Sequence, residues 1–435
     1  MMSAERVFPL PAVPQQLEDT GLSGDLVLQI VIKTLHVAGE LTGAELGDRL
    51  GVSFQIIEPA LTLLRREHHC EIAGGAMLGG PSYTYRVTDA GRVRAALFLE
   101  DNHYVGALPV PLEQYTRYMA EFAKEEPTTA TRELIGGAFS HLVLSRRVLD
   151  QLGPAIAARH SLFVYGPPGN GKTIISQAIR NVLSGNIAVP HALSIDGHII
   201  RIYDPVNHQR DDPPSIDEGL TRAESYDRRW VLCRRPLVTA GGELTLDALE
   251  LGYSTSAGFY RAPLQMLANG GVLVIDDFGR QQVSARELLS RWIVPLESRV
   301  DYLTLRTGQK FEVPFQAFVV FATNLKPSEL VDEAFLRRIR YKVLAESPTV
   351  DEFVRIFEKY CQTKNLDFDR ALVEHIVDHE LGPRGVRLRG CQPRDLIEHA
   401  LAIAGYLDRP RVLTPDLLSE ACASYFVEDR DLTTA

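Results

Sequence analysis

The chain has 435 residues, of which 45% are hydrophobic and 23% charged, and its formal net charge at pH 7 is −10. This length predicts two or three domains of about 150 residues each, and no apolar run approaches the ~20 residues that a membrane-spanning helix requires. The negative charge repels nucleic acid, so a DNA or RNA contact would need a local basic patch.

The N-terminus and the cysteines predict a soluble, cytoplasmic protein. The opening segment MMSAERVFPLPAVPQQ has no basic stretch leading into an apolar one, so no secretory signal is expected. The five cysteines are isolated and odd in number, which argues against both a disulfide framework and a thiolate zinc site. A reducing compartment fits this pattern.

In chain order, residues 1–22 are rich in proline and predict an extended arm. Residues 23–103 contain three helix-like stretches separated by Gly or Ser turns, followed by the alternating segments CEIAG and YTYRVTD, which predict a hairpin. Three helices followed by a hairpin resemble a winged helix. Residues 104–134, rich in Pro, Thr and Gly, predict a linker.

Residues 135–345 alternate short apolar runs with helical stretches, which is typical of a parallel α/β sheet. The four apolar runs are SLFVY, HIIRIY, VLVID and AFVVFAT. Residues 346–430 contain only helical periods and predict a small helical lid domain. The expected fold class is therefore α/β, with a parallel sheet core and a helical lid, preceded by a winged-helix-like module.

The stretch GPPGNGKT lies between the apolar run SLFVY and the helical sequence IISQAIRNVL. Its spacing G-x-x-x-x-G-K-T is that of a P-loop, in which Lys172 reaches the β and γ phosphates of ATP and the Thr173 hydroxyl binds Mg²⁺. The alternative is a structural glycine turn. The residues predicted to bind the nucleotide here are Gly166, Pro167, Pro168, Gly169, Asn170, Gly171, Lys172 and Thr173.

Two further apolar strands end in polar residues. Val272 to Ile275 lead into Asp276, which we assign to the magnesium shell, and Asp277, which we assign to orienting and deprotonating the attacking water. The run AFVVFAT ends in Thr323 and is followed by Asn324, and these two residues form a polar tip suited to positioning a water against a γ-phosphate. A solvated turn acid and a simple strand-end cap are the respective alternatives.

Two arginine positions follow. Arg337 and Arg338 in DEAFLRRIRYKV lie beside acids and an apolar face, and a surface salt-bridge cluster is the alternative to a functional role. Arg394 lies in the first turn of a helix that begins near GCQPR. A cation there opposes the helix dipole, so a nearby anion such as phosphate would explain it, and an ordinary exposed arginine is the alternative.

The order of these elements resembles that of the AAA+ ATPases over about residues 135–430. The resemblance implies Walker A at 166–173, Walker B at 272–277, sensor one at Asn324, arginine fingers at Arg337 or Arg338, and sensor two at Arg394. It further implies an ATP-hydrolysing homo-oligomeric ring, usually a hexamer, in which the finger reaches the γ-phosphate held by the neighbouring subunit. The family usually has glutamate at position 277, so slow hydrolysis is compatible with the aspartate.

Within that family, ESRVDYLTLRTGQKFEVPFQAFVVFATN resembles the branch with a β-hairpin before sensor one, which includes MoxR-type chaperone ATPases and enhancer-binding activators. The turn is expected at Thr307, Gly308 and Gln309. GYSTSA is spaced like the substrate-contacting GAFTGA loop of those activators, although Tyr253 is displaced by one position from their aromatic residue. The loop is a candidate contact surface, and a buried aromatic turn is the alternative.

Charge favours a protein partner over DNA for the N-terminal module. Residues 23–100 contain seven basic and nine acidic residues, a net charge of −2, although Arg86, Arg92 and Arg94 keep a DNA contact open. The expected function is ATP-driven, chaperone-like remodelling or regulation of a macromolecular complex of unidentified composition. The alternatives are a DNA-bound regulator switched by ATP and a non-hydrolysing scaffold gated by ATP.

Overall fold

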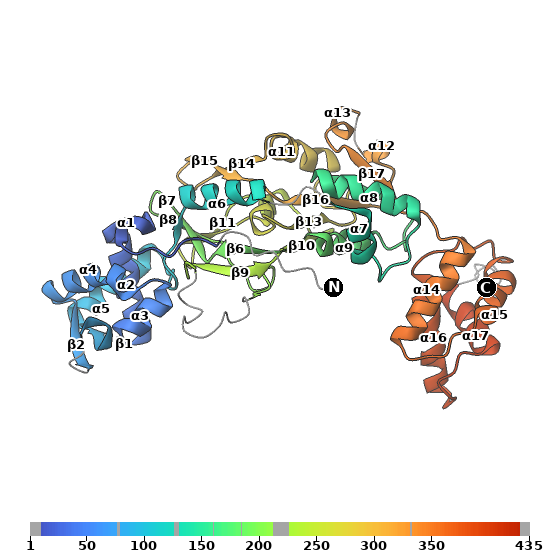
Figure 1. Ribbon diagram of the computed structural model, residues 1–435, viewed down its shortest axis with the longest axis horizontal. Coiled ribbons are helices and arrows are strands. Elements are labelled where there is room, and N and C mark those ends of the chain that lie inside the picture. The colour runs from blue at the N-terminus through green and yellow to red at the C-terminus, as the bar shows by residue number, and fades with distance from the viewer. Residues whose placement is uncertain are drawn as a thin grey trace, which may run out of the picture. The chain divides into compact units, whose positions relative to one another are not determined.

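The computed structural model (Figure 1) describes residues 10–75, 79–125, 130–159, 161–183, 185–211, 226–330 and 333–426. The tip of the expected N-terminal hairpin, residues 76–78, and the end of the expected lid, residues 427–430, lie outside these ranges. No helix within them is long and apolar enough to cross a membrane. The chain forms two compact units: the first contains Met1–Pro127, Leu183–Leu273 and Glu287–Phe318, and the second Thr128–Val182, Val274–Arg286 and Val319–Ala435.

The N-terminal part of the first unit has a helix-strand-helix-helix-strand-strand order. Thr42 begins one helix with a capping box, in which its hydroxyl accepts from the Glu45 N–H and the Glu45 carboxylate accepts from the Thr42 N–H. The strands form a sheet of order β1-β3-β2, and a helix follows them. The elements are α2 (Gly24–Ala38), β1 (Glu40–Thr42), α3 (Gly43–Leu50), α4 (Phe54–Arg66), β2 (Cys70–Gly75), β3 (Tyr83–Val87) and α5 (Asp89–Asp101).

The expected linker contains a buried helix, so the linker prediction is wrong for that stretch. Helix α6 (Leu112–Glu125) follows the short strand β4 (Val110–Pro111), and its apolar residues are buried in the core of the first unit. Proline, threonine and glycine at the two ends of the stretch dominated its composition and hid the helical period between them. The buried side chains of α6 are Tyr115, Tyr118, Met119 and Phe122.

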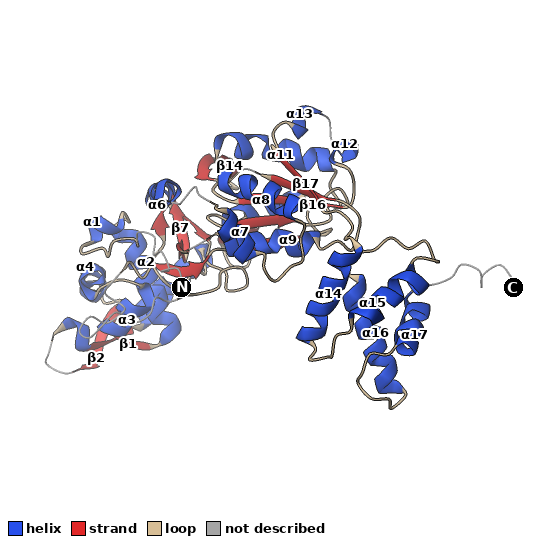
Figure 2. Ribbon diagram, turned by 45° about the vertical axis from the view of Figure 1, so that its right-hand side comes forward, coloured by secondary structure: helices blue, strands red, loops and turns tan. Residues whose placement is uncertain are grey.

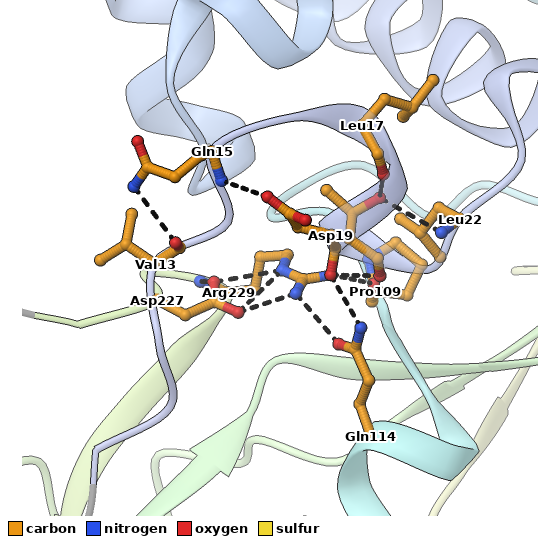
Figure 3. Close-up of polar contacts among 10 residues, drawn as sticks. Val13, Gln15, Leu17, Asp19, Leu22, Pro109, Gln114, Asp227 and Arg229 are labelled. Atoms are coloured by element: carbon orange, nitrogen blue, oxygen red, sulfur yellow. Dashed lines mark hydrogen bonds and ion pairs between the residues drawn. The ribbon is translucent and has the colours of Figure 1, made fainter.

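The expected arm is also partly folded. It contains the short helix α1 (Leu17–Thr20), and the Pro11 carbonyl accepts from the Asp227 N–H at 2.9 Å. The Arg229 guanidinium pairs with the Asp227 carboxylate at 2.8 Å (Figure 3). It also donates to the Thr20 carbonyl at 3.0 Å, which ties the arm to this pair. Arg229 also donates to Gln114 Oε1 at 3.1 Å, so one arginine joins the arm, α6 and the segment that contains Asp227.

The strand predicted at HIIRIY does not belong to the parallel sheet, which is a correction. It forms β8 in a mixed sheet of order β11-β12-β8-β7-β4. An apolar run identifies a strand but does not identify its partners, and here β8 pairs with the strand just before it in the chain and with β12. Further strands of the first unit are β6 (Asn186–Pro190), β7 (Ala192–Ile195), β8 (His198–Arg201), β9 (Trp230–Arg234), β10 (Leu237–Ala240), β11 (Gly252–Ser254), β12 (Phe259–Arg261), β14 (Val300–Thr304) and β15 (Lys310–Pro314).

The predicted parallel sheet is present, with strand order β10-β13-β16-β5-β17, which confirms the α/β fold class. Strands β16 and β17 flank β5 and both pair with it in parallel, so their carboxyl ends meet at one edge. Helices α7, α8 and α9 lie beside these strands in Figure 2. The sheet's other strands and its helices are β5 (Leu162–Tyr165), β13 (Val272–Ile275), β16 (Phe318–Thr323), β17 (Tyr341–Leu344), α7 (Arg132–Ala138), α8 (Arg146–Ala158), α9 (Lys172–Ala178), α12 (Pro327–Leu330) and α13 (Glu333–Leu336).

The C-terminal helices have a core of their own, in which Phe353, Ile376, Leu396 and Leu418 are fully buried. A capping box at Thr349 begins the first of them. The helices are α14 (Val350–Thr363), α15 (Arg370–Ile376) continuing as a π-helical turn (Val377–Leu381), α16 (Gln392–Tyr406) and α17 (Pro415–Tyr425). The remaining described helices are α10 (Leu264–Leu267) and α11 (Ala285–Ser298), with 3₁₀ turns at Gly80–Ser82, Ile179–Val182 and Leu246–Leu249.

Candidate active site

The loop after β5 has a backbone that requires glycine. Gly166 has φ +139°, and a Cβ there would lie 2.5 Å from the Ala345 carbonyl oxygen. Gly169 has φ +80°, and a Cβ there would lie 2.6 Å from Cys391 Sγ. Side chains are excluded at both positions by conformation and by space. The loop therefore presents backbone rather than side chains before helix α9 begins at Lys172.

Lys172 is buried beside the loop, and its ammonium group donates to two loop carbonyls, Gly166 at 3.1 Å and Pro167 at 2.9 Å. Burial lowers the pKa of Lys172, and the carboxylates of Asp277 and Asp276 oppose that effect. Because the groups that accept its hydrogen bonds are neutral carbonyls, this cation can be transferred to an anionic ligand at little cost.

Thr173 and Asp276 meet although 103 positions separate them in sequence. The Thr173 hydroxyl donates to Asp276 Oδ2 at 2.7 Å. A hydroxyl and a carboxylate at this separation are hard oxygen donors, of the kind that bind Mg²⁺ with water and phosphate oxygens in the remaining positions. The two residues fit the metal predicted from the sequence.

Asp277 and Asn324 also meet, at the ends of neighbouring strands. Asn324 Nδ2 donates to Asp277 Oδ1 at 3.1 Å, and the Asp277 side chain is exposed. The Asp277 backbone is left-handed, with φ +48°, a conformation in which Asp and Asn are several-fold enriched over other non-glycine residues. The backbone therefore gives a structural reason for aspartate at this position.

The neighbouring Thr323, part of the same predicted polar tip, has a different place. Its hydroxyl donates to the Phe278 carbonyl at 2.7 Å, and its side chain is buried. The Phe278 N–H in turn donates to the Ala322 carbonyl at 2.7 Å. These bonds fasten the turn after β13 to the end of β16, so that Asp277 and Asn324 face each other.

The predicted nucleotide-binding and metal-binding residues from Pro168 onward line one cavity of about 720 Å³, together with Asp277 and Asn324. This volume is within the range of small-molecule and cofactor sites. No sequence signal marked the other lining residues, because they come from separate elements and form no motif. These additional lining residues include His141, Leu142, Ser145, Val148, Ile356, Tyr360, Thr363 and Cys391.

Arg394 lines the same cavity from the start of α16. Its guanidinium pairs with the adjacent Asp395, through Nε at 2.9 Å and Nη2 at 2.8 Å to Oδ1. The chain itself thus supplies one anion for this cation. Two contacts, Cys391 N–H to the Gly169 carbonyl at 2.8 Å and Gly390 N–H to Asn170 Oδ1 at 3.4 Å, join the start of α16 to the loop.

The structure does not bring the two candidate finger arginines into this cavity. Arg337 and Arg338 follow the end of α13, where Arg337 is exposed and Arg338 is half-buried. Neither is among the described residues that line the cavity of their own chain. An arginine on this segment would have to act on a site other than the one its own chain carries.

The GYSTSA segment forms strand β11 and the start of the turn that leads to β12, and β14 and β15 form a second hairpin at the place where the sequence predicted one. The Arg306 guanidinium lies 4.3 Å from the centre of the Tyr253 ring, and the Arg306 N–H donates to the Tyr260 hydroxyl at 3.0 Å, so the two hairpins are in contact. The Ala257 carbonyl accepts from the His103 N–H at 2.7 Å. Within GYSTSA itself, only Thr255 and Ser256 at the tip are exposed.

Comparison with known proteins finds limited likeness. Residues 349–424, the C-terminal helices, match a family described as a domain of unknown function (DUF8689). A Salmonella typhimurium protein named "Uncharacterized protein YifB" is 25% identical over 232 residues, which are 53% of this chain and 36% of that protein. The chain thus spans about a third of the length of the curated relative that it matches.

Solved structures of two other proteins are similar to part of this chain. The Thermotoga maritima RuvB Holliday junction branch migration motor is 15% identical, with 65% of this chain and 69% of that chain covered and a TM-score of 0.38. Brucella abortus NtrX in complex with ADP is 14% identical, with 69% and 61% covered and a TM-score of 0.38.

Proposed function

We propose that this chain is a Mg²⁺-dependent ATPase of the AAA+ type that remodels or regulates a protein complex. The observation that carries the proposal is the meeting of chemically matched groups in one cavity: Lys172 under a glycine loop, Thr173 bonded to Asp276, and Asp277 bonded to Asn324. ATP with Mg²⁺ supplies the anhydride that is cleaved.

Each residue has a task that follows from its position. The loop amides and Lys172 bind the β and γ phosphates, and Thr173 and Asp276 hold the metal. Asp277 accepts a proton from the attacking water, and Asn324 orients both the carboxylate and that water. Because the Asp277 side chain is exposed and lines the cavity, water can reach it directly.

The catalytic site is completed by a second copy of the chain. Arg337 and Arg338 lie outside their own cavity on a segment that includes an exposed arginine. We assign one of them to the γ-phosphate held by the neighbouring subunit of a ring homo-oligomer, for which we propose a hexamer. An arginine supplied in this way accelerates other P-loop enzymes by about 10³- to 10⁵-fold, so an isolated subunit should be almost inactive.

The test is ATPase rate per subunit against protein concentration. The wild type should show a rate that rises with concentration, Lys172→Ala should neither bind nor hydrolyse ATP, and either Arg337→Ala or Arg338→Ala should bind ATP without hydrolysing it. Arg117→Ala, which replaces an exposed arginine on α6, is the matched control. If both finger variants assemble and hydrolyse at the wild-type rate, the arginine assignment is wrong.

A mixing experiment separates a shared site from a folding defect. Subunits with Arg338→Ala keep an intact pocket, and subunits with Asp277→Ala keep an intact finger. Mixed rings should regain part of the activity at interfaces that combine the two intact halves. No recovery, with mixed assembly demonstrated by a size tag on one variant, would contradict the shared site.

We interpret residues 23–103 as a winged-helix-like module that docks protein. The arginines that favour DNA are engaged: Arg86 pairs with Glu40 and Glu71, while Arg92 and Arg94 pair with acids of their own module. A DNA contact would have to break these pairs or find other cations.

The turn that precedes helix α4 also contacts another segment of the chain. A Cβ on Gly51, in the turn before that helix, would lie 2.8 Å from the Arg228 carbonyl oxygen, and the Arg228 guanidinium donates to the Val52 carbonyl at 3.2 Å. Recognition helices enter the major groove with their N-terminal residues, and here the turn just before that end is in contact with another part of the same unit.

Both alternative functions remain distinguishable. Stimulation of hydrolysis by duplex DNA, with a steep loss of binding as salt rises, would favour the DNA-bound regulator. Tight ATP binding with negligible turnover at every protein concentration would favour the scaffold.

A further inference from the structure

Asp395 lies between Tyr425 and Arg394 in a series of side-chain contacts that ends at the proposed nucleotide cavity. Its Oδ1 accepts from both Nε and Nη2 of Arg394, and its Oδ2 accepts from the Tyr425 hydroxyl at 3.0 Å. Tyr425 is the last residue of α17, and Arg394 and Asp395 lie in the first turn of α16. The contacts therefore run from one lid helix, through a carboxylate, to the cavity wall.

This arrangement is unusual for adjacent helix residues. Side chains at positions i and i+1 of a helix do not normally face each other, yet one Asp395 oxygen receives two Arg394 donors. The Tyr425 hydroxyl holds the other oxygen from a different helix. Burial raises the pKa of the Tyr425 phenol, which keeps the hydroxyl protonated as a donor.

The pair also leaves Arg394 able to bind a ligand. A guanidinium has five N–H donors in a rigid plane. Asp395 accepts from Nε and Nη2, so Nη1 is outside this pair. The Arg394 side chain is 54% exposed and lines the cavity, whereas the Asp395 side chain is only 18% exposed. The carboxylate is therefore the more buried partner, and the arginine is the partner that lines the cavity.

We infer that Asp395 and Tyr425 are positioning residues that hold the Arg394 guanidinium toward the phosphates of the bound nucleotide. This inference rests on the proposed function. Both residues act through Arg394, because neither is among the described residues that line the cavity. Ordering a mobile side chain costs free energy when a ligand binds. If the Arg394 guanidinium is already held in place, less of that cost is paid on binding and the affinity is higher.

The experiment measures the affinity of the full chain for a non-hydrolysable ATP analogue with Mg²⁺ by calorimetry. Asp395→Asn should weaken binding by about two- to fivefold, the size expected for one partly exposed ion pair. Tyr425→Phe should weaken it less. The decisive variant is Asp395→Asn in an Arg394→Ala background, where no further loss should occur, because the positioned group is gone.

Controls separate the possible outcomes. Glu420→Gln, which removes another lid carboxylate paired with an arginine, should bind as the wild type does. Wild-type affinity for Asp395→Asn, tighter binding, or an equal loss in the Arg394→Ala background would overturn the inference. Failure of the proposed function looks different: the wild type would not bind the analogue, or Lys172→Ala would bind it normally.

Discussion

Replacing Asp227 with alanine should destabilise the first unit strongly, because Arg229 would keep its charge in a buried place. The side chains of Asp227 and Arg229 are each 2% exposed. Asp227 accepts from Nε and Nη2 of Arg229, whereas the other partners of the guanidinium are neutral oxygens. Removing one member of a buried pair costs about 3–5 kcal/mol, a large part of the ~5–15 kcal/mol by which a domain is stable.

The assay is urea denaturation followed by tryptophan fluorescence. The chain has two tryptophans, Trp230 and Trp292, and both are buried in stretches of the first unit, so their emission reports on that unit. With a denaturant slope of about 3 kcal/mol per molar urea, the midpoint should fall by roughly 1–2 M.

The matched control is Asp48→Ala, which removes the partner of the adjacent arginine, Arg228. Asp48 is 67% exposed, so its loss should cost no more than about 1 kcal/mol. Equal shifts of the urea midpoint for the two variants would refute the reasoning that burial sets the cost in unfolding free energy. A loss of unfolding free energy below about 1 kcal/mol for Asp227→Ala would refute it as well.

Three other predictions test the site and the fold. Asp277→Asn should keep ATP binding and slow hydrolysis by about 10²- to 10⁴-fold, measured as phosphate release at saturating ATP; hydrolysis within a factor of two of wild type would remove Asp277 as the base. The pKa of His191 is lowered from 6.5 to about 4, mainly by burial and also by nearby arginine charges, which act in the same direction. As the pH falls, the unfolded chain takes up a proton at this histidine before the folded chain does. The stability of the folded state should therefore fall by roughly 3 kcal/mol as pH drops from 6.5 toward 4, and His191→Gln should flatten that profile in urea titrations. Gly51→Ala should destabilise more than Gly308→Ala, since both have positive φ but only Gly51 lies against the Arg228 backbone; equal urea midpoints would contradict this.

Parts of the candidate site were predictable from local sequence. The glycine loop and Lys172 are close neighbours in the chain, and the strand and helix on either side of them have clear apolar patterns. Asp276 and Asn324 were identifiable because each follows a buried strand of the parallel sheet, and the carboxyl ends of such strands share one edge. The proximity of Thr173 to Asp276 follows from that rule, although its distance does not.

Other parts were not predictable. The helix at residues 112–125 was hidden by the proline-rich and threonine-rich ends of its stretch, and the strand at 198–201 was assigned to the wrong sheet. The cavity wall at residues 141–148 and on α14 carries no motif. The sequence predicted a phosphate as the anion beside Arg394. The structure shows the Asp395 carboxylate as a partner of the Arg394 guanidinium.

The amino-acid sequence by itself determined which short segments can carry phosphate chemistry, because glycine conformations and strand ends depend on a few neighbouring residues. Only the tertiary structure decided which of these segments share a cavity, which arginines face it and which acids hold them. Those contacts join residues far apart in the chain, and their formation depends on how whole elements pack. Asn170 and Ala345, for example, lie 175 positions apart, and Asn170 Nδ2 donates a hydrogen bond to the Ala345 carbonyl at 3.2 Å.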